Sequence, residues 1–343
     1  MNFIKKNLTI ILVILFALVL RFWRLDTYPA FNADEAAVGY NAYSLIQTGR
    51  DEHGNSWPIH FQSFNDYKPG LYFYLVIPFV KIIGLNEWAV RIPGALLGVL
   101  TVLVLYFLGK ELFQDRYKFK VGRLRFTFGE ITALMLAVSP WHIHFSRGGW
   151  EVNAATFFIV LGVLMFIRAI KGPSLKSFTL SILPFVLSLY TYHAARVIVP
   201  LLGIGLLVIY GKDLIKNTKP ALRAGLIGLV LLLPLILDLT KGSVFSRAAG
   251  VGLFADPGPL NRINEQRGEH NDFTGLGAKL LHNKAVNYGL AFIKNWAEHF
   301  HGEFLFLSGD GIQRNKVPET GQMYLLDSLF ILIGLIVIAK LPK

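Results

Sequence analysis

Two adjacent acids beyond the apolar N-terminal run are of a residue type that could do chemistry. Asp34 and Glu35 follow an apolar N-terminal run, and Lys68 in NDYKPGLYFY and Glu151 in SPWHIHFSRGGWEVN come later in the chain. A carboxylate can accept a proton during catalysis, and a cation can stabilise a phosphate or a developing negative charge. Beside a membrane, these residue types would suit a proton-accepting base next to a phosphate-bearing lipid.

Each of these charges also has an ordinary structural interpretation. Asp34 and Glu35 could stabilise a helix N-terminus through the helix dipole, and Glu151 could do the same before the next apolar run. Anchoring to lipid headgroups would explain any single one of the candidate cations, which are Lys68, Arg147 and Arg196. Nearby histidines are more often hydrogen-bonded wall residues than metal ligands, and no zinc-type spacing connects His142, His144 and His193.

The composition excludes most soluble classes of protein. Of 343 residues, 53% are hydrophobic and 16% are charged, with a mean hydropathy of +0.48; soluble domains carry about 25% charged residues. The chain has no cysteine, which excludes disulfides and thiolate sites. The formal net charge is +12, but no nucleic-acid recognition motif stands apart from the apolar runs. We attribute the excess to cytoplasmic Lys and Arg that orient membrane spans, and expect no nucleic acid as a partner.

The candidate residues must be positioned by membrane helices. A spanning helix needs about 20 mostly apolar residues. The expected fold is therefore an all-α integral membrane protein, a polytopic helical bundle with about eight spans plus external interfacial helices. The segments that meet the criterion, some with flanking residues added, are 8–22, 92–113, 128–143, 154–170, 178–190, 197–210, 222–239 and 323–339.

Basic clusters predict which side of the membrane each loop faces. The densest cluster lies between residues 113 and 128, and short loops of this kind stay in the cytoplasm. With the N-terminus also cytoplasmic, the short apolar segment 71–84, which contains Pro78 and Lys81, should not cross the membrane. The external segments are then 23–91, 146–153, 191–196 and 240–322, and within the last of these 286–309 could lie in the interface.

The sequence gives no sign of a nucleotide site. It contains no Walker sequence, dinucleotide fingerprint or other glycine-rich loop that would cradle a phosphate. A site on the outer surface of the membrane would also lack a supply of nucleotides. These observations favour a donor that is carried by a lipid.

Five segments carry a resemblance to a known family. They are NADEAAVGYNAYSLIQTGRDEHGNSWP, DYKPGLYFYL, EWAVRIPGALLGVLTVLVLYFLGKELF, SPWHIHFSRGGWEVNAATFFIVLG and YTYHAARVIVPLL. Over about residues 8–239 the chain resembles bacterial GT-C membrane glycosyltransferases of the protein O-mannosyltransferase and aminoarabinose-transferase-like group. The resemblance implies a GT-C-type bundle, a polyprenyl-phosphate sugar donor, and a protein, lipid or glycan acceptor.

The same resemblance implies roles for individual residues. Asp34 matches the catalytic acid of the first external loop, Glu35 is its neighbour, and Glu151 takes the place of the second-loop acid. Lys68 matches the lysine that meets the lipid phosphate. The further candidates for binding this phosphate are Arg147 and Arg196.

Two departures from the family pattern concern the donor site and the metal. The motif here is Lys-Pro-Gly rather than Lys-Pro-Pro, and a lone Glu151 stands where some relatives have Asp-x-Asp or Asp-x-Glu. No cofactor is therefore assigned, and a divalent metal stays an open alternative.

The resemblance also implies a domain organisation. A catalytic membrane module is expected over residues 1–239, with its first external loop at 23–91. A long external loop with an interfacial helix follows at 240–322, and a final span at 323–343. Because relatives continue with more helices, we expect the chain to be a fragment or a short variant.

The sequence therefore predicts a glycosyltransferase of the cell membrane, with a cytoplasmic N-terminus, an external active site and inversion at the sugar carbon. A transporter or flippase of a lipid-linked sugar is the alternative, although transporters tend to place ionisable residues at mid-membrane between repeated halves. A structural subunit is a second alternative, but it would give no reason for the acids and Lys68 to share one side.

Overall fold

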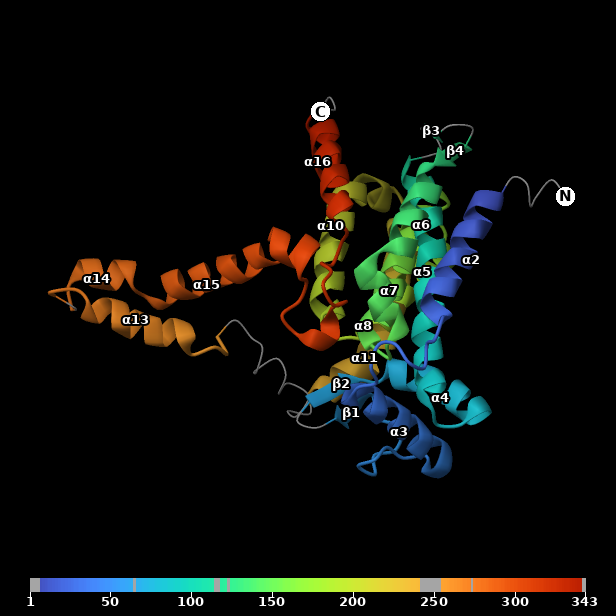
Figure 1. Cartoon of the computed structure of the whole chain (residues 1–343), viewed down its shortest axis with the longest axis horizontal. Coiled ribbons are helices and arrows are strands. Elements are labelled where there is room, and N and C mark those ends of the chain that lie inside the picture. The colour runs from blue at the N-terminus through green and yellow to red at the C-terminus, as the bar shows by residue number, and fades with distance from the viewer. Residues whose placement is uncertain are drawn as a thin grey trace. The chain divides into compact units, whose positions relative to one another are not determined.

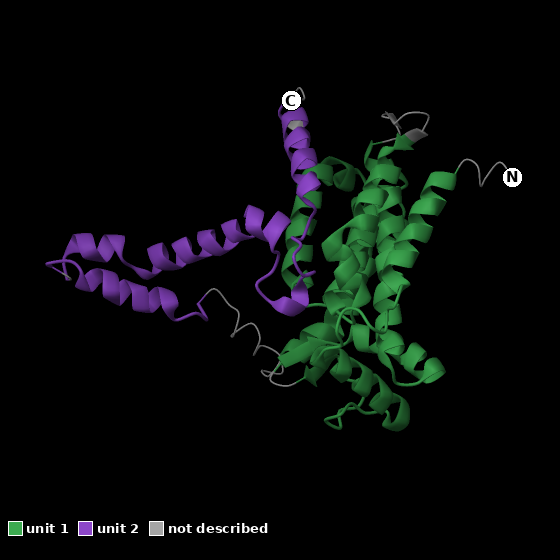
Figure 2. Cartoon of the chain, in the orientation of Figure 1, with its two compact units in different colours: residues 1–240 green, residues 241–343 purple. Residues whose placement is uncertain are grey.

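The computed structural model describes residues 7–63, 66–113, 118–121, 124–240, 254–272 and 274–340. The chain divides into two compact units, residues 1–240 and 241–343, shown in different colours in Figure 2. All of the candidate residues lie in the first unit.

The first unit is a bundle of helices with two short hairpins (Figure 1). Its helices are α2 (Leu8–Phe22), α3 (Ala33–Thr48), α4 (Leu71–Ile83), α5 (Glu87–Phe113), α6 (Phe128–Val138), α7 (Pro140–Arg147), α8 (Glu151–Lys171), α9 (Leu175–Leu189), α10 (Ala195–Lys216) and α11 (Thr218–Leu239). Its antiparallel hairpins pair β1 (His60–Ser63) with β2 (Asp66–Pro69) and β3 (Lys118–Val121) with β4 (Leu124–Thr127).

The described residues are mostly helical, as expected, and the two short hairpins are additions that the sequence did not indicate. Each hairpin lies between two helices. The pairing of its two strands satisfies the backbone N–H and C=O groups of residues that are not helical. The hairpins lie at opposite ends of the bundle, with β1–β2 beside α3 and β3–β4 beyond the start of α6 (Figure 1). The side chains of the expected cytoplasmic basic cluster, 115–125, lie outside the described residues.

Helix α5 is the centre of the bundle, because it packs against α2, α4, α6, α7 and α8. One side of α5 contributes Val102 and Tyr106 to a buried cluster with α2 and α6. Another side contributes Val104 and Leu108 to a cluster with Phe157 and other residues of α8. Helix α5 therefore positions the five helices that pack around it.

The expected span 128–143 is wrong as a single helix. Helix α6 ends at Val138, Ser139 is extended, and α7 begins with Pro140 at its first position. Proline disfavours the helical conformation in the residue before it and is well tolerated at the start of a helix. The hydropathy of the segment is continuous, but Pro140 divides it into two helices.

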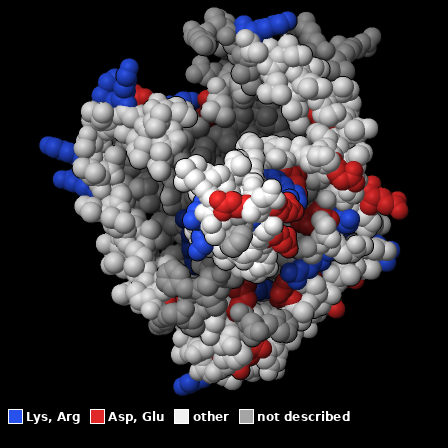
Figure 3. All heavy atoms as spheres, turned by 90° about the vertical axis from the view of Figure 1, so that its left-hand side faces the viewer, with Lys and Arg blue, Asp and Glu red and all other residues white. Residues whose placement is uncertain are grey.

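Four described helices are long and apolar enough to cross a membrane: α5, α8, α10 and α11. Shorter apolar helices cover other expected spans, and the chain is a multi-pass membrane protein. Large apolar side chains on α10 and α11 are exposed, Val208 by 79% of its surface, and wide areas of the face in Figure 3 carry no Lys, Arg, Asp or Glu. Helix α4 has 13 residues and so reaches about 20 Å, which is too short for a hydrocarbon core of about 30 Å.

The second unit contains α13 (Gly258–Gly268), α14 (Leu276–Leu281), α15 (Lys284–Glu298), a π-helical turn (Glu303–Leu307), a 3₁₀ turn (Gln313–Asn315) and α16 (Leu325–Lys340). Helix α15 and the π-helical turn occupy most of the segment 286–309 that was expected at the membrane interface. Exposed apolar residues recur along α15 at Leu290, Ile293 and Trp296. Its position at the interface stays a prediction.

Gly129 tests the close packing of α5 on α6. A Cβ at Gly129 would lie 2.5 Å from the backbone oxygen of Tyr106, whereas a Cβ at Gly205 in α10 would meet nothing within 4 Å. We expect Gly129→Ala to destabilise the bundle by about 1–3 kcal/mol through overpacking. Gly205→Ala should be neutral or slightly stabilising. The measurement is reversible SDS denaturation in detergent micelles, and equal midpoints for the two variants would contradict this packing.

Candidate active site

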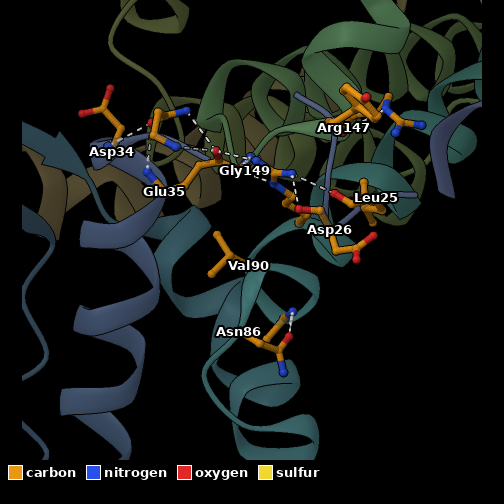
Figure 4. Close-up of polar contacts among 12 residues, drawn as sticks. Leu25, Asp26, Asp34, Glu35, Asn86, Val90, Arg147 and Gly149 are labelled. Carbon is orange, nitrogen blue, oxygen red and sulfur yellow. Dashed lines mark hydrogen bonds and ion pairs between the residues drawn. The ribbon is translucent and has the colours of Figure 1, made fainter. Parts of the chain in front are cut away.

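The two adjacent acids of α3 serve different purposes. Asn32 caps the helix, because its side-chain oxygen accepts hydrogen bonds from the backbone N–H groups of Asp34 and Glu35, at 2.9 and 3.2 Å. The Glu35 carboxylate reaches back and accepts from the Asn32 backbone N–H at 3.1 Å, which completes a capping box. The side chains of Asp34 and Glu35 therefore point in different directions (Figure 4).

Glu35 is fully buried and forms a two-pronged ion pair with Arg91 of α5. The Nε and Nη2 atoms of Arg91 lie 2.6 and 2.9 Å from the two carboxylate oxygens. The backbone N–H of Gly149 donates to the same carboxylate at 3.0 Å (Figure 4). Arg91 also donates to the carbonyl of Leu25 at 2.8 Å. This pair joins α3, α5, the chain after α2 and the segment before α8, so its contacts favour a positioning role for Glu35.

Asp34 and Glu151 both lie beside Lys68. The Lys68 ammonium lies 2.8 Å from Asp34 Oδ1 and 3.8 Å from Glu151 Oε1. The three side chains are mostly buried, with 23%, 11% and 10% of the Asp34, Lys68 and Glu151 side chains exposed. The convergence expected from the topology, over sequence separations of 34 and 117 residues, is confirmed. Helix capping alone would give no reason for it.

The hairpin β1–β2 presents Lys68 to the acids. Lys68 is paired with Phe61 across the hairpin, and Phe61 stacks on Phe73 of α4 with ring centroids 4.1 Å apart. The backbone N–H of Gly70 donates to the carbonyl of Ile59 at 2.8 Å. A Cβ at Gly70 would lie 2.7 Å from that carbonyl oxygen, so only glycine fits where the hairpin turns into α4.

Tyr72 supports the other side of the cluster. Its hydroxyl donates to the carbonyl of Val90 at 3.0 Å. Burial raises the pKa of the Tyr72 phenol, and the carboxylates of Glu35 and Glu151 raise it further. The phenol therefore remains protonated and neutral beside the two acids, where it acts as a hydrogen-bond donor.

Arg147 is not brought to the Lys68 cluster by any described contact. Its guanidinium donates to the backbone carbonyls of Leu20, Trp23, Arg24 and Tyr28, at 2.6–3.2 Å. These contacts tie the end of α7 to the chain that leaves α2, and they satisfy carbonyls that a helix end exposes. The expectation that Arg147 binds the donor phosphate is not supported by this arrangement.

Arg196 lies on the reverse side of the hairpin. Its Nη2 is 2.5 Å from His60 Nε2, and His60 Nδ1 is 2.6 Å from Asp238 Oδ2 at the end of α11. Because a guanidinium can only donate, His60 Nε2 must accept and Nδ1 must carry the proton. His60 is paired with Pro69, one register position from the Phe61–Lys68 pair, and successive strand residues face opposite sides. Arg196 thus holds the hairpin from behind, and its contacts do not support the expected role in binding phosphate.

Sequence reasoning missed His60 and Asp238, which lie 178 residues apart, and also the buried Arg21. Arg21 donates to the carbonyls of Leu136 and Ala137, at 3.2 and 3.1 Å, in the last turn of α6 before the break at Ser139. Pro140 was the available signal for that break. His142 and His193 bond to Arg21 and Arg196, which confirms the expectation of hydrogen-bonded wall residues.

The described residues provide no ready metal site. No three His, Asp or Glu side chains in that part of the chain are grouped so that they could hold an ion. Glu151, which the resemblance placed at the second-loop acid, is beside the Lys68 ammonium. This donor set does not fit a divalent metal, and no step is derived through one.

Comparisons with known proteins agree with this architecture. Residues 67–237 match the model of the family described as "Dolichyl-phosphate-mannose-protein mannosyltransferase". Over 104 residues the chain is 33% identical to the Bacillus subtilis (strain 168) protein named "Putative mannosyltransferase YycA", which amounts to 30% of this chain and 14% of that protein. The family resemblance drawn from the sequence is thereby confirmed.

Solved structures share the fold. An archaeal oligosaccharyltransferase, AglB from Archaeoglobus fulgidus, solved with an inhibitory peptide and a dolichol-phosphate, superposes with a TM-score of 0.51 at 15% identity. The match covers 87% of this chain and 37% of that one. A second structure of an Archaeoglobus fulgidus oligosaccharyltransferase, with Zn and sulfate, gives a TM-score of 0.51 at 17% identity and covers 85% of this chain and 43% of that one. The chain thus spans less than half the length of these relatives.

The buried ion pair gives a stability prediction. Glu35→Ala would leave Arg91 charged and unpaired, which should destabilise the bundle by roughly 3–5 kcal/mol. Asp34→Asn removes a partly exposed partner and should cost about 1 kcal/mol or less. SDS denaturation of both purified variants measures the difference. A Glu35→Ala midpoint as high as that of Asp34→Asn would show that the pair is not structural.

Proposed function

We propose that this chain, on the strength of its family match over residues 67–237, transfers a sugar from a polyprenyl-phosphate carrier to an acceptor at the outer face of the membrane. The proposed site is the cluster of Asp34, Lys68 and Glu151. The main support is that the carboxylates of Asp34 and Glu151 both lie beside the ammonium of Lys68. Asp34 is at the start of α3, Glu151 is at the start of α8, and Lys68 is in the hairpin β1–β2.

The cluster offers a cation for the donor phosphate. The donor carries a negatively charged phosphodiester, which would compete with Asp34 and Glu151 for the Lys68 ammonium. Lys68 would then stabilise the lipid phosphate as it departs, because a fixed positive charge in a water-poor site lowers the energy of a developing anion. The partly exposed rings of α4, Tyr74 and Phe79, would suit an isoprenoid tail that lies along the membrane interface.

Release of Lys68 to the phosphate would leave Asp34 as the base. The acceptor oxygen or nitrogen attacks the anomeric carbon, its bond to that carbon forms, and the bond from the carbon to the phosphate oxygen breaks. The acceptor proton passes to Asp34 and the bonding electrons pass to the lipid phosphate. A single in-line displacement of this kind inverts the configuration of the sugar carbon.

The remaining predicted residues are assigned to positioning. Glu35 holds α3 against α5 through Arg91, Arg147 ties α7 to the chain after α2, and Arg196 fixes the hairpin through His60. These charged residues lie near helix ends, whereas transporters usually place ionisable residues at mid-membrane. The transferase is therefore preferred to the transporter.

Substitutions at Asp34 and Lys68 test the two roles. Asp34→Asn keeps the size of the side chain but cannot accept a proton, so kcat for transfer from a polyprenyl-phosphate sugar should fall about 10²–10⁴-fold. Lys68→Met should lower turnover about 10²–10³-fold and raise the KM for the donor. The exposed cation Lys81 on α4 provides the control, since Lys81→Met should change neither constant. Activity that is lost in Asp34→Ala but kept in Asp34→Asn would refute the base assignment.

The helices beside the site give a prediction about sidedness. Arg196 is the second residue of α10 and Asp238 is the last but one of α11. Both contact His60, and each helix has 22 residues. At about 1.5 Å per residue, their connecting turn lies roughly 33 Å from the site, which is one bilayer core away. Because the chain has no cysteine, single cysteines at Asn55 and Lys219 can be labelled selectively in intact cells. Asn55 should react from outside and Lys219 only after permeabilisation, and the reverse pattern would place the site in the cytoplasm.

A further inference from the structure

A cavity lies next to the proposed catalytic cluster. It has a volume of about 500 Å³, within the roughly 300–1,000 Å³ that is usual for small-molecule sites. Helix α3 supplies one wall, with Ala33, Ala36 and Tyr40 on the same helical face. Glu52, His53 and Ser63 also line it.

Two elements that line the cavity, α3 and the hairpin β1–β2, also carry residues of the catalytic cluster. Asp34 lies between Ala33 and Ala36 on α3, and Ser63 belongs to the hairpin that presents Lys68. The ion pair between Asp34 and Lys68, at 2.8 Å, joins helix α3 to this hairpin. A molecule in the cavity would thus lie beside the proposed base.

Hydrogen bonds within the chain hold Glu52 and His53, two polar residues of the cavity wall, in place. Glu52 is bound to Asn41 of α3 twice, since the Asn41 amide donates to the Glu52 carboxylate at 2.8 Å and accepts from the Glu52 backbone N–H at 3.0 Å. The Asp51 carboxylate accepts from the backbone N–H groups of His53 and Asn55, at 3.0 and 2.7 Å, which fixes the turn. Glu52 and His53 are therefore presented by an ordered loop.

Ser63 indicates that a ligand completes this wall. Its residue surface is only 3% exposed, and its hydroxyl has no hydrogen-bond partner among the described residues. Buried hydroxyls in folded proteins are normally paired, so an orphan that lines a cavity points to a partner that is not part of the chain. A hydroxyl on a bound molecule would satisfy it.

We propose that this cavity is the acceptor subsite and that it takes a carbohydrate. The half-exposed ring of Tyr40 and the alanines of α3 form an apolar platform for the C–H face of a sugar ring, as aromatic side chains combine apolar area with a polar tip. Glu52, His53 and Ser63 face the hydroxyl groups at the rim of that ring. One of these hydroxyl groups is then presented to Asp34. The inference rests on the proposed transfer reaction and adds the class of its acceptor.

Binding can be tested without turnover. The full chain in lipid nanodiscs is examined by saturation-transfer NMR with methyl α-mannopyranoside as the probe, and with a threonine-containing peptide in a separate sample. We expect saturation of the glycoside by the native chain and at least a tenfold loss in Ala36→Trp, because an indole at this exposed position fills the cavity. Gln47→Trp introduces the same side chain at an exposed position of α3 outside the lining, and should bind normally. Ser63→Ala should bind about five- to tenfold more weakly, as expected for one lost hydrogen bond.

The outcomes separate this inference from the proposed function. Equal saturation of the glycoside by Ala36→Trp and Gln47→Trp would refute the proposed subsite. No saturation of the glycoside by the native chain would also refute it. Binding of the peptide without the glycoside overturns the carbohydrate class. Hydrolysis of polyprenyl-phosphate mannose is measured in parallel: a chain that cleaves this donor but ignores the glycoside refutes only the inference, whereas one that binds the glycoside but never cleaves a donor refutes the transferase.

Discussion

The ion pair between Glu35 and Arg91 is the interaction on which the rest of the site depends. Both side chains are fully buried, and a buried carboxylate is tolerated only when its oxygens are well supplied with donors. Arg91, Asn32 and the backbone N–H of Gly149 supply them. Since these donors come from three separate segments, the pair sets the position of α3 against α5 and of the chain that leads into Glu151.

The consequence for the site is that its charges lie at the ends of elements. Asp34 is in the first turn of α3, Glu151 is the first residue of α8, and Lys68 is near the end of β2. The dipole of a helix stabilises negative charge at its N-terminus. The positions of Asp34 and Glu151 therefore favour the charged carboxylate. The same geometry lets Lys68 bind either carboxylate, or an anion that arrives in their place.

A network behind the hairpin completes this arrangement. Asp238 and Arg196 hold His60 from the ends of α11 and α10, and the stack of Phe61 on Phe73 holds the other face of β1. The hairpin is thereby fixed on both faces, which keeps the backbone of Lys68 beside the acids. Precise placement of this kind matters because proton transfer requires hydrogen-bond distances.

Much of the fold could be predicted from the sequence, because apolar runs and basic clusters report directly on the bilayer. That logic put Asp34, Lys68 and Glu151 on one side of the membrane, and the structure brings them together. It could not tell which of two adjacent acids is buried, since adjacent helix residues differ in direction by about 100° and either could have faced α5. The partners of Arg147 and Arg196 could not be predicted either. Arg147 binds backbone carbonyls, which leave no pattern in the sequence, and Arg196 binds a histidine 136 residues away.

The central claim is that the Lys68 ammonium exchanges the Asp34 carboxylate for the donor phosphate. Equilibrium binding of a polyprenyl phosphate to the full chain in nanodiscs, followed by native mass spectrometry, tests this exchange directly. The account predicts that Lys68→Met abolishes binding, and that Asp34→Asn binds more tightly than the native chain because a competing anion has been removed. Weaker binding by Asp34→Asn, to the same extent as by Lys68→Met, would contradict it.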